Sequence, residues 1–311
     1  MNHIAVIGEA VADAFLPSGQ AGTGVLNLRV RPGGSPVNTA VGLSRLGTPT
    51  TFLGRLATGP LGDLIRDHLA GSKVDLSAAV AAPEPATLAI ASLDPSGRAA
   101  YAFYADGTAD WQWTPDELAR LDPGGVRCVH AGSMALARDP GGPLIETLLG
   151  AAREAGATVS IDPNVRPSFV APDLYRERLG RWTSLADLFR LSDEDLEHLW
   201  PGAAPERACD AFHRDGVRLV VVTLGARGAL ASLDGARVTV PAPPIDPVDT
   251  VGAGDAFNAG LLHWLDEHGR LGGRLPDLTL DEVERAVEFA VQNAARTCLV
   301  PGADPPWRGD V

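Results

Sequence analysis

The sequence predicts a doubly wound α/β fold, in which a mostly parallel sheet is flanked by helices. Short apolar runs rich in Val and Ile recur along the chain, and amphipathic stretches lie between them. The runs are at 3–8, 126–131, 157–161 and 217–223, and the amphipathic stretches are at 36–46, 60–70, 142–155, 205–215 and 280–297. The runs have the pattern of buried strands, and the stretches have that of half-buried helices. Such alternation places helices on both faces of a parallel sheet, whose ligands bind at the carboxyl ends of the strands.

Two segments interrupt the alternation, at about 12–32 and 86–104. In the second, Thr87–Leu93 and Ala99–Tyr104 flank an Asp-Pro-Ser-Gly turn at residues 94–97, which favours a hairpin. We expect both segments to form a small β-sheet within a single domain over residues 1–311. That sheet is either a lid over the active site or an ordinary edge hairpin, and the pattern alone leaves both interpretations open.

The composition limits the classes of ligand. The chain has 311 residues, 45% of them hydrophobic, and a net charge of −13, with lysine only at Lys73. This is typical of a soluble globular protein and argues against nucleic-acid binding, which needs a basic surface. An anionic substrate such as ATP would need backbone amides, a few arginines and a metal ion. Cys128, Cys209 and Cys298 are widely spaced, which indicates structural thiols in a reducing compartment.

The N-terminal residues indicate where the protein resides. An apolar run begins at residue 3, without a basic segment, an apolar core and a cleavage site before it. The longest apolar run, near residues 219–224, has the length of a strand and cannot cross a bilayer. We therefore expect a cytoplasmic protein without a membrane partner.

Residues 249–262 combine a glycine turn with the start of a helix. They read Asp-Thr-Val-Gly-Ala-Gly-Asp-Ala-Phe-Asn-Ala-Gly-Leu-Leu, and apolar residues then recur with the period of a half-buried helix. A helix start offers free backbone N–H groups, and Gly252 and Gly254 leave room for an anion to approach them. Asp255 in the first turn would face a hydroxyl opposite that anion, where a carboxylate can accept its proton. The simpler interpretation of Asp255 is a helix cap.

A second glycine turn precedes the stretch at 36–46, in the sequence Arg-Pro-Gly-Gly-Ser-Pro-Val-Asn at residues 31–38. Gly33 and Gly34 would let a small polar ligand lie against the backbone, and Asn38 offers a donor and an acceptor for hydroxyls. Asp13 and Arg166 each follow a predicted strand, where a carboxylate could accept hydrogen bonds from sugar hydroxyls. Without further evidence, a polar helix start and a solvated loop acid explain these residues as well.

Two further loops could bind metal and phosphate. Ser-Asp-Glu-Asp at residues 192–195 follows a strand-like run. Its carboxylates could hold Mg²⁺ through water, although Ser192 acting as a helix cap is an adequate explanation. The sequence Thr-Leu-Gly-Ala-Arg-Gly at 223–228 could present its backbone to nucleotide phosphates, or be only a tight turn.

Together these motifs resemble the ribokinase-like carbohydrate kinases, also called the phosphofructokinase B family. The resemblance rests on Gly-Gly-x-x-x-Asn near residue 35 and Asp-Thr-x-Gly-Ala-Gly-Asp near residue 250, in the family's order and spacing, and it covers essentially the whole chain. It implies a doubly wound α/β domain with a small β lid, which transfers the γ-phosphate of ATP to a sugar hydroxyl.

The resemblance also implies roles for individual residues. Asp255 matches the catalytic base, and Gly252, Ala253 and Gly254 match the anion hole. The matched sugar-binding residues are Asp13, Gly33, Gly34, Asn38 and Arg166, and the matched nucleotide-binding residues are Thr223, Gly225, Gly228 and Asn293. Asp195 stands at the family's magnesium motif, and Asp249 and Thr250 resemble positions that support K⁺.

The chain departs from the family pattern at two places. Its Asn-x-x-Glu metal motif is replaced by Ser192 and Asp195. Fructokinases and 2-keto-3-deoxygluconate kinases commonly have an arginine after an aromatic pair, where this chain has Ala105. The spelling of the Gly-Gly-Ser-Pro-Val-Asn and Asp-Pro-Asn-Val-Arg motifs nevertheless resembles that of fructokinases more than that of ribokinases.

We therefore expect an ATP-dependent sugar kinase with Mg²⁺, an optional K⁺ and a small neutral sugar as acceptor, most readily fructose. The alternatives are a 2-keto-3-deoxygluconate kinase, a ribokinase or nucleoside kinase, and a sugar-binding regulator without catalysis. A dinucleotide-dependent oxidoreductase is rejected, because the first strand does not lead into Gly-x-Gly-x-x-Gly. A homodimer through the lid stays open.

Overall fold

The computed structural model describes residues 3–16, 24–93, 99–119 and 125–310. Its largest sheet has eight described strands in the order β14-β13-β12-β11-β10-β9-β1-β4. These strands are β1 (His3–Ile7), β4 (Thr50–Leu53), β9 (Val126–Gly132), β10 (Thr158–Asp162), β11 (Leu188–Ser192), β12 (Leu219–Thr223), β13 (Ala229–Leu233) and β14 (Ala236–Val240). Neighbours from β4 to β12 are parallel, and β13 and β14 are antiparallel additions at one edge. The predicted mostly parallel sheet is confirmed.

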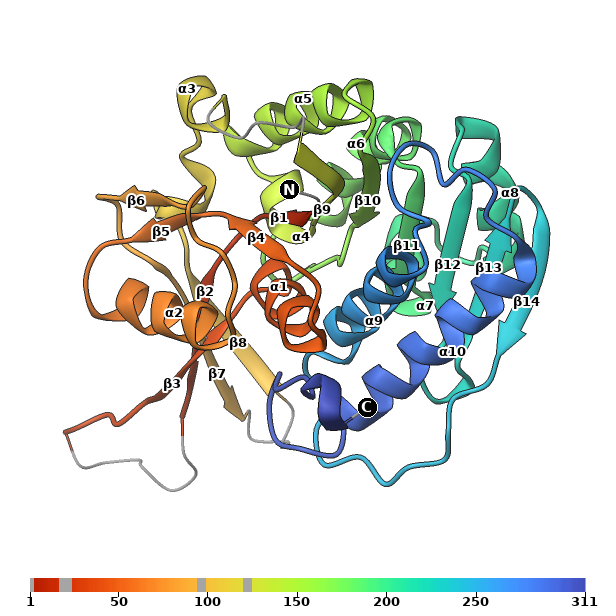
Figure 1. The fold of residues 1–311 in the computed structure, drawn as a ribbon. Helices are drawn as coiled ribbons and strands as arrows, with labels where there is room; N and C mark the ends of the chain where they lie inside the picture. The colour runs from red at the N-terminus through yellow and green to blue at the C-terminus, as the bar shows by residue number, and fades with distance from the viewer. Residues whose placement is uncertain (1–2, 17–23, 94–98, 120–124, 311) are drawn as a thin grey trace.

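Helices cover both faces of this sheet (Figure 1). The longer helices are α1 (Ser35–Leu46), α2 (Pro60–Gly71), α5 (Gly141–Glu154), α6 (Pro172–Leu185), α8 (Pro205–Asp215), α9 (Ala253–Glu267) and α10 (Leu280–Thr297). The shorter ones are α3 (Pro115–Leu118), α4 (Ser133–Ala137) and α7 (Asp193–Leu199), with 3-10 turns at Ala109–Trp111, Gly225–Arg227 and Arg308–Asp310. Among the described residues, no helix is both long and apolar enough to cross a membrane.

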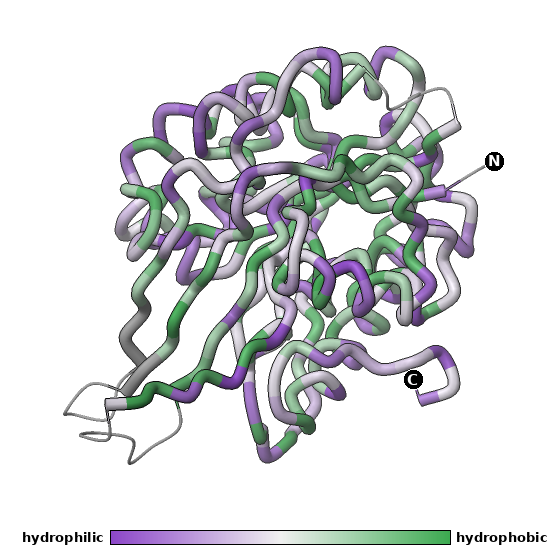
Figure 2. The backbone as a smooth tube through the Cα atoms, turned by 90° about the vertical axis from the view of Figure 1, so that its left-hand side faces the viewer, coloured by the Kyte–Doolittle hydropathy of each residue, from purple (hydrophilic) through white to green (hydrophobic). Residues whose placement is uncertain are grey.

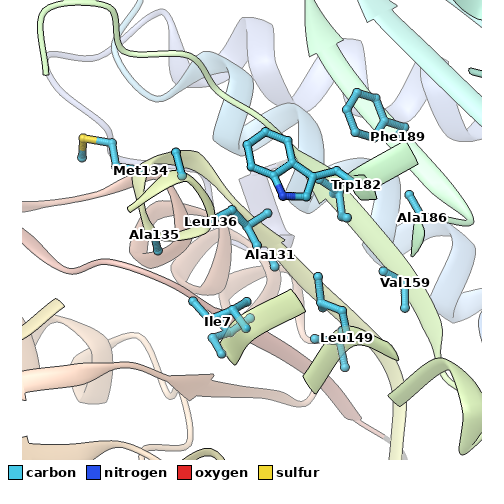
Figure 3. Packing of buried hydrophobic residues seen from close by; sticks show 14 of the residues in the cluster. Ile7, Ala131, Met134, Ala135, Leu136, Leu149, Val159, Trp182, Ala186 and Phe189 are labelled. Carbon is cyan, nitrogen blue, oxygen red and sulfur yellow. The ribbon is translucent and has the colours of Figure 1, made fainter. Parts of the chain in front are cut away.

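The side chains of β1 show why the sheet needs two helical layers. Ile4 and Val6 belong to a core cluster shared with α1, α9 and α10, whereas Ala5 and Ile7 belong to a second cluster shared with α5 and α6. Successive residues of a strand point to opposite faces, so a strand that is apolar at every position must be covered on both. Figure 3 shows the second cluster, in which Trp182 of α6 packs near the strands.

The two segments that interrupt the alternation form one small sheet, which confirms that prediction. Its strands are β2 (Val11–Phe15), β3 (Arg29–Gly33), β7 (Thr87–Leu93) and β8 (Ala99–Tyr104), in the order β3-β2-β7-β8. The sheet extends away from the body of the molecule (Figures 1 and 2). The turn predicted at residues 94–97 lies outside the described residues. A separate two-stranded sheet is formed by β5 (Arg55–Ala57) and β6 (Val80–Ala82), which come between β4 and β7 in the sequence.

Candidate active site

A cavity of about 650 Å³ lies where the carboxyl ends of β1, β10 and β11 meet the small sheet and the starts of α1 and α9. Its walls include Val11 and Asp13 of β2, Ala89 of β7 and Phe103 of β8, so the small sheet forms one side of it. This contact favours a lid over an edge hairpin. The predicted site residues that line the cavity are Asp13, Gly34, Asn38, Arg166, Asp195, Thr250, Gly252, Gly254 and Asp255.

The turn before α9 has the conformation that its glycines allow. Gly252 caps the helix with a φ of 78°, in the left-handed region, and a Cβ there would lie 2.5 Å from the Cβ of Ala303. A Cβ on Gly254 would lie 3.0 Å from both terminal nitrogens of Arg190. Any larger residue would therefore displace its surroundings. The turn exposes the start of α9 to the cavity, where helix N–H groups can bind an anion.

Asp255 is held by two donors from α1. Its Oδ1 accepts a hydrogen bond from Ser35 Oγ at 2.6 Å and its Oδ2 accepts one from Asn38 Nδ2 at 2.8 Å. Burial raises the pKa of Asp255, and these two bonds oppose that rise. Raising the pKa makes the carboxylate a better proton acceptor than a solvated one. Asn38 therefore orients Asp255, which is a different role from the predicted hydrogen bonds to ligand hydroxyls.

Asp13 lies across the cavity on the small sheet. Burial raises its pKa to about 6, the charge of Arg166 opposes the shift, and the charge of Asp255 adds to it. Gly33 does not line the cavity, but a Cβ there would lie 1.9 Å from Asp13 Oδ2. Gly34 has a φ of 100°, and its Cβ would lie 2.8 Å from the carbonyl oxygen of Glu9. Because neither glycine has a side chain, the carboxylate of Asp13 can lie against Gly33 and the backbone of Glu9 can lie against Gly34.

Arg166 is an exposed residue at the rim of the cavity. Its Nη1 donates to the carbonyl oxygen of Val165 at 3.1 Å, and its backbone N–H donates to the hydroxyl of Tyr175 at 3.4 Å. These bonds hold the loop after β10. They leave most of the guanidinium donors available to a ligand.

Asp195 caps α7 and supports the same loop. Its Oδ2 accepts hydrogen bonds from the N–H and the hydroxyl of Ser192, at 2.9 and 2.6 Å, and its Oδ1 accepts one from Val165 N–H at 2.7 Å. The predicted cap at Ser192 is present as a full capping box. About four acceptor directions exist on a carboxylate, so one remains for a water or a metal.

Four other residues predicted to bind metal or nucleotide do not line the cavity, namely Asp249, Thr223, Gly225 and Gly228. Asp249 accepts hydrogen bonds from Val251 N–H at 3.1 Å and Gly302 N–H at 2.8 Å. Thr223 ends β12 beside Ser192 of β11 and starts the loop that contains Gly225 and Gly228, which lies next to the cavity but does not line it. In the described part of the chain, no three His, Cys, Asp or Glu side chains group as metal ligands.

Asn293 is not brought to the cavity. Its side chain is completely buried in α10, and its Nδ2 donates to the carbonyl oxygen of Ala256 at 2.7 Å. The bond ties α10 to the first turn of α9. In this conformation, Asn293 lies in the interior behind the glycine turn that precedes α9, because the packing of α10 on α9 turns it inward.

Three residues of the site were missed by sequence reasoning. Ser35 and Glu9 line the cavity, and burial raises the pKa of Glu9 to about 7. Arg190 lies in β11, where its Nη1 donates to Asp162 Oδ2 and its Nη2 to Thr223 Oγ1, both at 2.7 Å. An arginine inside the apolar run Leu-Phe-Arg-Leu at 188–191 is the signal that could have identified it.

Comparisons with known proteins concern the family and the fold of the chain. Residues 1–308 match the family described as pfkB family carbohydrate kinase. A fructokinase of Klebsiella pneumoniae is 34% identical over 298 residues, which are 93% of this chain and 94% of that protein. A fructokinase structure from Vibrio cholerae O395 with fructose, ADP and calcium ion aligns with a TM-score of 0.83 and 28% identity, covering 97% of this chain and 94% of that one. One from Xylella fastidiosa with bound ATP aligns with a TM-score of 0.88 and 25% identity, covering 97% and 93%. The predicted ribokinase-like fold is confirmed.

Proposed function

Since the chain belongs to the pfkB family of carbohydrate kinases, we propose that this sugar kinase uses ATP to phosphorylate fructose. The observation that carries the proposal is the buried carboxylate of Asp255 in the first turn of α9, held by Ser35 and Asn38 beside an anion-binding turn. The bound fructose in the relative from Vibrio cholerae and the bound ATP in that from Xylella fastidiosa support the choice of both substrates.

The proposed reaction is a direct phosphoryl transfer. The acceptor hydroxyl of the sugar gives its proton to the Asp255 carboxylate while its oxygen forms a bond to the γ-phosphorus of ATP. The bond from that phosphorus to the β–γ bridging oxygen breaks, and its electron pair leaves with ADP. The backbone N–H groups of Gly252, Ala253 and Gly254 bind the oxygens of the transferred group. The deep burial of Asp255 supports this role, because desolvation raises its affinity for the proton.

The acceptor is proposed to be a neutral sugar. Asp13 can accept hydrogen bonds from two hydroxyls, and Arg166 is the exposed cation at the rim. Ala105 stands where fructokinases and 2-keto-3-deoxygluconate kinases commonly have an arginine, and it is buried, with its carbonyl oxygen accepting hydrogen bonds from Thr108 and Trp111. A substrate carboxylate would therefore lack a partner there. Losing a charge-assisted hydrogen bond costs about 1.5 to 3 kcal/mol, or roughly ten- to over a hundredfold in affinity.

The nucleotide is proposed to lie along the loop that contains Thr223, Gly225 and Gly228, with Mg²⁺ on its phosphates. One acceptor direction on Asp195 fits a water of that ion, because Mg²⁺ keeps several waters and takes few protein ligands. When bound, Mg²⁺ neutralises phosphate charge. Asp249 and Thr250 are proposed to support K⁺ beside the turn. The buried position of Asn293 argues against a direct adenine contact in this conformation.

An ADP-release assay with ATP, Mg²⁺ and a panel of sugars tests the proposal. Fructose is expected to give a higher kcat/KM than 2-keto-3-deoxygluconate, ribose or a nucleoside. Asp13→Ala is expected to raise the KM for fructose severely while ATP affinity, measured by calorimetry, changes little. A better rate with the keto acid, or an unchanged KM for fructose in Asp13→Ala, would contradict the proposed pocket. Fructose binding without ADP release would favour a sugar-binding regulator.

We also propose a cytoplasmic homodimer that associates through the small sheet. Exposed apolar side chains on and beside this sheet support the association, namely Phe15, Val25, Leu26 and Tyr104. Sedimentation of the wild type and of Phe15→Asp measures it. A wild type that stays monomeric at all concentrations would contradict the dimer.

A further inference from the structure

Arg190 is a buried cation at the base of the proposed kinase site. It is 5% exposed, yet it lines the cavity. Its two terminal nitrogens donate to Asp162 and Thr223, whereas its Nε has no hydrogen-bond partner. Burying a donor without a partner is unfavourable, so an arginine at this place needs a reason beyond packing.

The guanidinium lies directly under the anion-binding turn. Both terminal nitrogens would be 3.0 Å from a Cβ on Gly254, and the guanidinium carbon lies 5.6 Å from the ring centre of Phe257, one turn further along α9. The absence of a side chain at Gly254 therefore lets Arg190 approach the backbone that carries the proposed anion hole. Hydrogen bonds to Asp162 and Thr223 hold the planar guanidinium of Arg190 in one orientation beneath Gly254.

The same arginine takes part in the network that supports α9. Asp162 Oδ2 accepts from Arg190 Nη1 and also from Asn258 Nδ2 at 2.6 Å, and Asn258 belongs to α9. Asp162 Oδ1 accepts from Asn164 N–H at 2.9 Å. The carboxylate of Asp162 thus accepts two hydrogen bonds on Oδ2 and one on Oδ1. The Arg190–Asp162 pair then forms a fixed dipole whose positive end faces the start of α9.

Positive charge is scarce in this acidic chain, so the buried charge of Arg190 beside the cavity is important. The chain has a net charge of −13, and its only lysine, Lys73, lines a different cavity beside Trp307. Among the described residues, the arginines that line the active-site cavity are Arg166, which is exposed, and Arg190, which is buried. Salt and water screen a buried charge much less than an exposed one.

We propose that Arg190 is a positioning residue for phosphoryl transfer: it supports the Gly252–Asp255 turn from below and directs fixed positive charge toward the phosphoryl group bound there. The inference rests on the proposed kinase activity. Arg190 acts through the turn and across space, so it is expected to favour the transition state, in which charge on the transferred group is redistributed, more than the bound sugar.

Four variants separate this role from a purely structural one. Arg190→Met removes the charge, and Arg190→Lys keeps it without the planar fork. Thr223→Val removes one acceptor but keeps the guanidinium, and it stays informative if Arg190→Met fails to fold. The matched control is Arg55→Met in β5, because Arg55 is also 5% exposed and paired with two acids, Glu84 and Glu117, but does not line the cavity.

The first readout is steady-state kinetics with ATP, Mg²⁺ and fructose. Arg190→Met is expected to lower kcat by about 10² to 10³, as for a lost oxyanion-hole donor, with the KM for fructose within about threefold of the wild type. Arg190→Lys should recover at least tenfold of that loss, and Thr223→Val should lower kcat by less than Arg190→Met. Arg55→Met should lower the melting temperature and leave kcat unchanged. If Arg190→Met keeps the wild-type kcat, the inference is overturned.

The second readout is the acid limb of kcat/KM against pH. The charged groups that face Asp255 are Asp13 and Asp162, which raise its pKa, and Arg166 and Arg190, which favour its ionised form. Removing the charge of Arg190 should therefore move the acid limb to higher pH in Arg190→Met and not in Arg190→Lys. Equal losses in both variants with an unmoved limb would indicate a structural role alone and overturn the inference.

Calorimetry with ATP and ADP, both with Mg²⁺, separates this inference from the proposed function. If the wild type phosphorylates no sugar in the panel, the proposed function fails, and nucleotide binding still tests Arg190. Arg190→Met should then lose at least tenfold in affinity for ATP and clearly less for ADP, because only ATP has the γ-phosphate above the turn. Equal losses for the two nucleotides would overturn the inference.

Discussion

Asp255 and Asp13 are two aspartates of one cavity with different surroundings. Asp255 is 7% exposed and bonded to Ser35 and Asn38, whereas Asp13 is half-buried and makes no hydrogen bond to another side chain of the described residues. Burial raises the pKa of both, to about 6 for Asp13. The oriented carboxylate suits proton transfer, and the one with free acceptor positions suits hydroxyl binding.

We expect Asp255→Asn to lower turnover by about 10² to 10⁴, the usual effect of a lost general base. The fold should persist, because an amide can still accept from Asn38 and donate to the hydroxyl of Ser35. Turnover, the melting temperature and the calorimetric affinity for ATP are measured for the wild type and the variant, and the last two are expected to change little. Turnover within a few-fold of the wild type, with a normal melting transition, would remove Asp255 from the mechanism.

The turn before α9 packs against the C-terminal segment, which in turn contacts the small sheet. Asp249 accepts a hydrogen bond from Gly302 N–H in the C-terminal segment, and Gly252 packs on Ala303 of the same segment. Arg31 of β3 donates to the carbonyl oxygen of Pro301 at 3.1 Å. The C-terminal segment therefore connects the small sheet to the turn before α9.

A monovalent cation is expected to order this turn. Activity should rise when K⁺ replaces a bulky organic cation at fixed ionic strength, because Asp249 and Thr250 stand at the turn and an ordered turn presents its N–H groups together. Initial rates in the two buffers measure the effect. Identical rates in the two buffers would show that K⁺ does not order the turn.

Over the whole molecule, several buried carboxyl groups make stability depend on pH. Burial raises the pKa of Glu9 to about 7, and the pKa values of Asp13 and Asp110 to about 6. A carboxyl group with a raised pKa in the folded state binds its proton more tightly there than in the unfolded chain. Its contribution to stability is complete below the unfolded pKa and is lost as pH rises through the folded pKa.

The melting temperature is therefore expected to fall between pH 5 and pH 8, and Glu9→Gln should reduce that fall. Each pKa unit corresponds to about 1.4 kcal/mol, so for Glu9 the difference is about 2 to 3 kcal/mol in the free energy of unfolding. Denaturant unfolding at the two pH values measures it. Glu154→Gln, at an exposed position of α5, is the control. Parallel pH dependences for the wild type and Glu9→Gln would show that Glu9 does not titrate in this range.

Much of the fold followed from local patterns. Apolar runs marked β1, β9, β10 and β12, and glycine turns marked the starts of α1 and α9. The antiparallel edge strands β13 and β14 and the short strand β4 were not predicted as parts of the sheet, because their sequences contain Thr, Ser, Ala or Arg and are not continuous runs rich in Val and Ile. Their places depend on pairing with strands elsewhere in the chain.

By itself the sequence determined the residues whose roles depend on local backbone geometry. Gly252, Gly254 and Asp255 are examples, since an acid in the first turn of a helix that follows a glycine turn lies close to the N-terminal N–H groups of that helix, whatever the surrounding fold. Only the tertiary structure decided which side chains meet. Ser35 and Asp255 are 220 residues apart in the chain, and Arg190 and Asp162 are 28 apart. Hydrogen bonds and burial depend on distance in space, so packing of the sheet and helices selected these partners and turned Asn293 into the interior.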